Sequence, residues 1–154
     1  MKPLETTVEE VLRNAIQSEV ETRVYYQQMA ERAGSLEVRQ RMLQLADAEL
    51  LHRTKLERKY RDTLKQEPPA PEPVKVDLDS DIRELDMTRA LKLSLERERD
   101  SESYYRFMAE RAPADSELAN LFFELADIEW KHKTDLQTEY ESTMNDPEQF
   151  LRDM

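Results

Sequence analysis

The stretch YYQQMAERA at residues 25–33 returns almost unchanged as YYRFMAERA at residues 104–112. A second pair of matching stretches follows downstream, LADAELLH at residues 45–52 and LADIEWKH at residues 125–132. Self-similarity of this kind predicts two copies of one structural unit. The register shifts by one residue between the two stretches of the second copy, which we interpret as one extra residue in its loop.

Each copy has the pattern of two amphipathic helices joined by a short turn. Apolar residues recur every three or four positions, as they do on a helix with one buried face. Breakers interrupt the pattern at Gly34-Ser35 in the first copy and at Pro113-Ala114-Asp115 in the second. We predict four long helices, at about residues 7–33, 36–65, 87–112 and 116–143. Thr7 and Glu10 form a capping box at the start of the first helix.

The composition favours the same all-α class. A chain of 154 residues with one glycine and few aromatic residues is typical of a single helical domain. The formal net charge of −11 argues against nucleic acid as a partner, because phosphate backbones repel a surface of the same sign. The absence of cysteine excludes disulfides and thiolate sites and fits a reducing compartment. Without an apolar signal core or bilayer-spanning segment, we expect a soluble cytoplasmic protein that binds no membrane.

Residues 66–86 form a connector between the two copies. Pro68, Pro69, Pro71 and Pro73 cannot continue a helix and favour extended backbone. An extended segment of this length reaches farther than a helix of about 27 residues, which is roughly 40 Å long. We therefore expect it to cross the whole bundle and set the second and third helices parallel, although the same reach would allow two chains to exchange hairpins. A short helix from Asp146-Pro147 is expected in the tail, residues 144–154.

The chain has two histidines, and they lie at matching positions of the two copies. Glu49 with His52, and Glu129 with His132, each form a Glu-x-x-His motif. This spacing places both side chains on one helix face about one turn apart, where a metal ion can bridge them. Each motif also interrupts an apolar stripe, which predicts a position in the core. The alternative is a pair of ordinary salt-bridging helix segments.

The other two helices carry one glutamate each on their apolar stripes, Glu19 and Glu98. Burial of four carboxylates without partners would destabilise the fold by several kcal/mol for each group, and the four negative charges would repel one another. Two divalent ions balance four carboxylates, and two neutral imidazoles complete the ligand set. Mixed carboxylate and imidazole ligands favour iron, with manganese as the second choice, over structural zinc. The charge balance therefore predicts a dinuclear site.

This ligand pattern resembles the di-iron carboxylate proteins of the ferritin-like superfamily, and within it the rubrerythrins. The resemblance covers the chain apart from its termini and the connector, and the spacings from Glu19 to Tyr26 and from Glu98 to Tyr105 repeat a rubrerythrin spacing. It implies one ferritin-like four-helix domain over residues 1–154, with hairpins at residues 7–65 and 87–143. It also implies two iron ions, held in the catalytic metal centre by Glu19, Glu49, His52, Glu98, Glu129 and His132.

The resemblance assigns roles within this set. Glu49 and Glu129 would bridge the two ions, the other two glutamates would be terminal ligands, and each histidine would bind one ion. Tyr26 and Tyr105 would donate hydrogen bonds to ligand carboxylates. They could equally be ordinary aromatic core residues.

Two features depart from the rubrerythrin pattern. Rubrerythrins usually carry Cys-x-x-Cys motifs that deliver electrons, so this chain needs an external donor, such as a rubredoxin-like protein or a flavoprotein. The third helix has Ser101 where an extra carboxylate is usual, with Glu102 beside it as a possible additional ligand. The resemblance implies a homodimer, open to hairpin exchange, that reacts with hydrogen peroxide or dioxygen.

Two other functions stay open at this point. A ferroxidase or iron-handling protein would bind iron as substrate and release it. A non-catalytic helical scaffold would hold a structural metal or none, and would tolerate loss of the glutamates and histidines.

Overall fold

The computed structural model describes residues 7–74, 78 and 82–145, and these residues form four helices and no strand. The helices are α1 (Val8–Glu31), α2 (Leu36–Leu64), α3 (Met87–Arg111) and α4 (Glu117–Met144). The predicted all-α class is confirmed, and every predicted helix boundary falls within two residues of the observed one. The short helix expected from Asp146 lies outside the described residues.

Hydroxyl side chains cap the N-termini of three helices and satisfy amide groups that have no partner inside the helix. The capping oxygens accept from backbone amides at 3.1–3.2 Å and belong to Thr7, Ser35 and Ser116. Two other residues turn the chain through left-handed backbone. Lys65 (φ 57°) ends α2, and Asp115 (φ 59°) lies in the turn before α4. The first helix therefore begins at the capping residue predicted for it.

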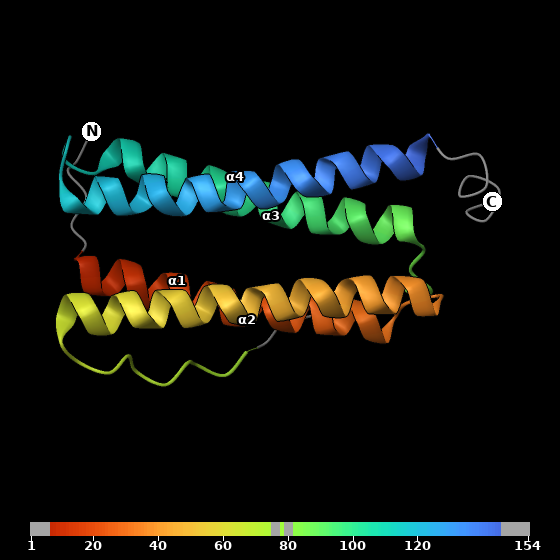
Figure 1. Ribbon diagram of the computed structural model, residues 1–154, viewed down its shortest axis with the longest axis horizontal. Helices are drawn as coiled ribbons and strands as arrows, with labels where there is room; N and C mark the ends of the chain where they lie inside the picture. Colours follow the sequence, from red (N-terminus) through yellow and green to blue (C-terminus); the bar gives the residue numbers. More distant parts are fainter. Residues whose placement is uncertain (1–6, 75–77, 79–81, 146–154) are drawn as a thin grey trace. The chain divides into compact units, whose positions relative to one another are not determined.

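The chain divides into two compact units, each built around a helical hairpin. One unit holds α1, α2 and the connector, and the other holds α3 and α4; in each, the two helices lie side by side and run antiparallel (Figure 1). Buried apolar residues follow the helical period along all four helices. No helix in the described part of the chain is long and apolar enough to cross a membrane. The single domain over residues 1–154 stays a prediction.

The connector runs from the end of α2 back to the α1–α2 turn, so it crosses the full length of this hairpin. Its last residues are tied to the turn: the amide of Gly34 donates to the carbonyl of Leu85, and the amide of Leu85 donates to the carbonyl of Arg32, both at 2.8 Å. Leu85 is buried, with 1% of its surface exposed. A side chain at position 34 would place its Cβ 3.2 Å from the Leu85 oxygen, so glycine permits this close approach.

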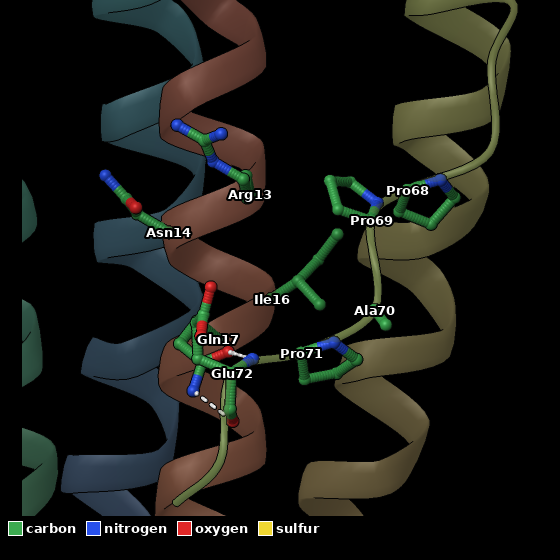
Figure 2. A pocket seen from close by; sticks show the side chains of 9 residues that line it. All are labelled: Arg13, Asn14, Ile16, Gln17, Pro68, Pro69, Ala70, Pro71 and Glu72. Atoms are coloured by element: carbon green, nitrogen blue, oxygen red, sulfur yellow. Dashed lines mark hydrogen bonds between the residues drawn. The ribbon is translucent and has the colours of Figure 1, made fainter.

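One side chain on α1 holds the middle of the connector. Gln17 donates from Nε2 to the carbonyl of Glu72 at 3.2 Å and accepts from the amide of Glu72 at 2.9 Å (Figure 2). These two hydrogen bonds satisfy the amide and the carbonyl of Glu72, which lies outside the helices. Prolines 68, 69 and 71 and the side chain of Ile16 enclose a hollow of about 290 Å³ beside it. Contacts within its own hairpin therefore hold the connector at Glu72 and at Leu85.

Candidate metal centre

The α3–α4 hairpin brings Glu98, Glu129 and His132 together. Their ligand atoms all lie within 4.8 Å of one another. Nδ1 of His132 is 3.6 Å from Oε2 of Glu98 and 3.8 Å from Oε2 of Glu129. The two glutamates are buried because they occupy the apolar stripes of α3 and α4. These separations suit three ligands around one ion, since each ligand atom lies about 2.1 Å from a bound metal.

The α1–α2 hairpin repeats the arrangement with Glu19, Glu49 and His52. Nδ1 of His52 is 3.8 Å from Oε2 of Glu19 and 3.6 Å from Oε2 of Glu49. Both glutamates are again buried on the inner faces of their helices. Each hairpin therefore contains two carboxylates within 3.8 Å of one imidazole, and we call these two sets the first and second half-sites in chain order.

His132 titrates far from its ordinary range. Burial lowers the pKa of its imidazole, but Glu129 and Glu98 raise it more, to about 10. Without a metal the group is an imidazolium beside two carboxylates. A metal ligand must be a neutral imidazole, so metal binding exchanges this proton for a dication.

The predicted tyrosines lie inside their hairpins. Tyr26 is 0% exposed and Tyr105 is 5% exposed. The ring of Tyr26 meets Tyr25 edge to face at a centroid distance of 5.8 Å, and the ring of Tyr105 lies 6.5 Å from that of Phe122. These contacts show that both rings are packed. Their hydrogen bonds to ligand carboxylates stay a prediction.

Glu102 lies outside the group formed by the second half-site. Its buried carboxylate accepts from Nζ of Lys133 at 2.5 Å and from Nε of Arg106 at 2.6 Å, and Arg106 also reaches Asp127 at 3.3 Å. Burial raises the pKa of Glu102, but the two cations lower it more, so the pKa falls below its ordinary value. The sequence analysis missed both cations. The available signal was the spacing of four residues from Glu102 to Arg106 on one helix.

The donor set fits a metal centre. The four half-site glutamates are only 3–6% exposed. Burying so many carboxylates is costly unless cations accompany them. Carboxylate oxygens and imidazole nitrogens are ligands that iron and manganese accept. The six predicted ligands therefore provide the charge and the chemistry for divalent metal ions.

Comparison with known proteins leads to the same family. The rubrerythrin family model matches residues 10–136, a span that contains all six predicted ligands. The chain belongs to the rubrerythrin family. An uncharacterized conserved protein from Magnetospirillum magnetotacticum MS-1 shares the fold of this rubrerythrin, with a TM-score of 0.65 and 22% identity over 89% of this chain and 95% of the other. A search of the curated proteins finds no match.

Family membership confirms the ferritin-like all-α class that the resemblance of the ligand pattern implied. Together with the clustered carboxylates and histidines, it supports a di-metal site in this rubrerythrin. The ligand assignment, residue by residue, remains the one predicted from the sequence.

Proposed function

We propose that this rubrerythrin is a di-iron oxidoreductase that reduces hydrogen peroxide or dioxygen. The observation that carries the proposal is the repeated half-site, a buried glutamate packed with a Glu-x-x-His motif in both hairpins. Two such half-sites provide four negative charges and two imidazoles, which match two divalent ions. Carboxylate-rich ligand sets of this kind suit iron, and manganese is the second choice.

The protein side chains bind the metal and shield it from bulk water. As the family resemblance implies, Glu49 and Glu129 would bridge the two ions, Glu19 and Glu98 would be terminal ligands, and each histidine would contribute one nitrogen. Because all four glutamates are buried, few waters compete for these ligands. Iron, when bound, supplies the redox change that no side chain here can provide.

Turnover needs electrons from outside the chain. Reduction of one hydrogen peroxide to two waters consumes two electrons and two protons. The chain contains no cysteine and hence no thiolate-bound redox centre of its own. We propose that a rubredoxin-like protein or a flavoprotein supplies the electrons, and that the working form is a homodimer.

A peroxide reaction with the ferrous protein tests the proposal. Metal-free protein is loaded anaerobically with two equivalents of ferrous iron, mixed with one equivalent of peroxide and followed by its absorption spectrum. We expect oxidation far faster than that of ferrous iron in buffer, loss of this rate in Glu129→Ala, and no change in Glu110→Ala, which alters an exposed glutamate of α3. Oxidation no faster than in buffer would contradict the proposal.

The same sample separates the two remaining functions. Iron that leaves the protein after oxidation would indicate a ferroxidase, for which iron is the substrate. A folded protein that binds no iron and is indifferent to Glu129→Ala would indicate a scaffold. Two irons retained through repeated peroxide additions with an external reductant would support the oxidoreductase.

A further inference from the structure

The two half-sites are not equally well assembled. In the second, the ligand atoms of Glu98, Glu129 and His132 all lie within 4.8 Å of one another. In the first, all three ligands belong to the described part of the chain, yet they do not form a group within this limit. A metal ion entering the second half-site meets three donors already gathered. An ion that binds the first half-site must bring its three ligands closer together, and this rearrangement reduces the free energy of binding.

The charges beside the half-sites also differ. The repeat that aligns Glu19 with Glu98 and His52 with His132 places Arg23 at the position of Glu102. It likewise places Arg53 at the position of Lys133. The second hairpin therefore has an anion and a cation at positions where the first hairpin has two cations.

In the second hairpin these two positions form an ion pair. Nζ of Lys133 on α4 reaches the buried carboxylate of Glu102 on α3, one helical turn from the ligand Glu98. The charge of Lys133 is thereby offset beside the half-site. Arg106 also binds Glu102 and reaches Asp127, so a dication bound to the second half-site meets two cations that two carboxylates offset.

In the first hairpin no such pair forms. The Nε atoms of Arg23 and Arg53 are buried and have no hydrogen-bond acceptor among the described residues. Arg53 approaches Glu57 at 3.6 Å, an ion pair longer than a hydrogen bond. Both guanidinium groups carry a positive charge. Arg23 lies one helical turn from Glu19, and Arg53 follows His52 directly, so both repel a dication at this half-site.

We propose that the two metal positions fill in a fixed order, the second half-site before the first, because Arg23 and Arg53 weaken the first. The proposal rests on the proposed function, in which each half-site takes one metal ion. Even at the dielectric constant of water, a unit charge roughly 6 Å from a dication changes its binding constant about tenfold. For equal protonation of the two histidines, the charge difference alone therefore separates the affinities of the two half-sites by about tenfold.

Cobalt(II) provides a probe that is independent of turnover. The full-length metal-free protein is titrated with cobalt(II), and binding is followed by calorimetry and visible absorption. We expect two equivalents with separated affinities. His132→Gln removes the tighter step and leaves the weaker one, whereas His52→Gln removes the weaker step and leaves the tighter one.

A charge substitution tests the cause of the order. Arg23→Gln is expected to tighten the weaker step about tenfold and to leave the tighter step unchanged. Arg13→Gln, on the same helix but paired with Glu9 at 3.7 Å and half exposed, is the matched control and should change neither step. Because Arg23→Gln removes no ligand, it stays informative if a histidine variant fails to fold.

The possible failures are distinguishable. Two equivalents of equal affinity, or loss of the tighter step in His52→Gln, would overturn the order while leaving a two-metal protein intact. Equal effects of Arg23→Gln and Arg13→Gln would overturn the assigned cause. Absence of any cobalt binding by the folded protein would overturn the order together with the proposed metal function.

Discussion

The two hairpins carry the same ligands in different surroundings. Within α1–α2, His52 lies 3.6–3.8 Å from its two glutamates, and within α3–α4, His132 lies 3.6–3.8 Å from its own. One helical turn away, the second hairpin holds the ion pair of Glu102 and Lys133, whereas the first has Arg23 and Arg53. The distances from each histidine to its two glutamates are alike in the two copies, whereas the neighbouring charges differ.

The turns of the two hairpins differ as well. The α1–α2 turn is tied to the end of the connector by backbone hydrogen bonds of Leu85 with Gly34 and with Arg32. The α3–α4 turn is longer and passes through Asp115 in left-handed backbone. The first hairpin is therefore stabilised by a segment outside its helices. The following predictions test how far the two copies have diverged.

The largest effect is expected from loss of a ligand. Glu129→Ala and Glu49→Ala each remove a carboxylate from one half-site. Loss of a residue that only orients a metal ligand typically lowers metal affinity by roughly 10- to 100-fold. Loss of the ligand itself should lower the affinity by more than this. In the metal-free protein Glu129→Ala should also be destabilising, because it removes one carboxylate partner of the His132 imidazolium. Metal titration and thermal unfolding in chelator measure the two effects. Unchanged affinity in both variants would refute the ligand assignment.

The ion pair beside the second half-site should give the next largest effect. Lys133→Met leaves the buried Glu102 with Arg106 alone and should lower the free energy of unfolding by about 1–3 kcal/mol. Arg53→Met, at the matching position of the first hairpin, removes a longer ion pair and should cost no more than about 0.5 kcal/mol. Urea denaturation of the metal-free proteins compares them. Equal costs would show that the two surroundings are energetically equivalent.

The pKa of His132 predicts a loss of stability in alkali. Its folded-state pKa of about 10 lies above the ordinary value of 6.5, so the protonated group stabilises the metal-free protein fully below pH 6.5. That contribution declines as the pH rises and is lost through pH 10. We expect the stability difference between the parent and His132→Gln to shrink by about 1 kcal/mol or more over this range. Urea denaturation at low and high pH measures the difference in the free energy of unfolding between the parent and His132→Gln. If this difference is the same at both pH values, His132 forms no ion pair with Glu98 and Glu129.

The smallest effect concerns the connector, which has no counterpart in the second hairpin. Gln17→Ala removes both hydrogen bonds to Glu72 and should cost about 1 kcal/mol or less, because the contact is exposed. Cleavage within residues 66–74 by limited proteolysis should become faster. Lys55→Ala, at an exposed position of α2 that does not line the hollow beside the connector, is the control. If both variants are cleaved at the parent's rate, Gln17 does not hold the connector.

Much of the fold could be predicted from local patterns. The helical period and the breakers at Gly34-Ser35 and Pro113 placed every helix boundary within two residues, because an amphipathic helix encodes its own buried face. The clustering of Glu98, Glu129 and His132 followed from the same period, since the ligands interrupt the apolar stripes. The partners of Glu102 could not be predicted, because Lys133 lies on another helix and its reach depends on how the two helices pack.

The sequence by itself determined the repeat, the all-α class and the two Glu-x-x-His motifs, because each is expressed in spacing along one helix. The tertiary structure decided which neighbours surround the ligands. Lys133 meets Glu102 across 31 positions of the chain, and Gln17 meets Glu72 across 55. Such contacts depend on the packing of separate elements, which fixes distances that helical periodicity does not contain. The sequence repeat already aligns Arg23 with Glu102 and Arg53 with Lys133, but the pairing of Glu102 with Lys133 became visible only in the folded hairpin.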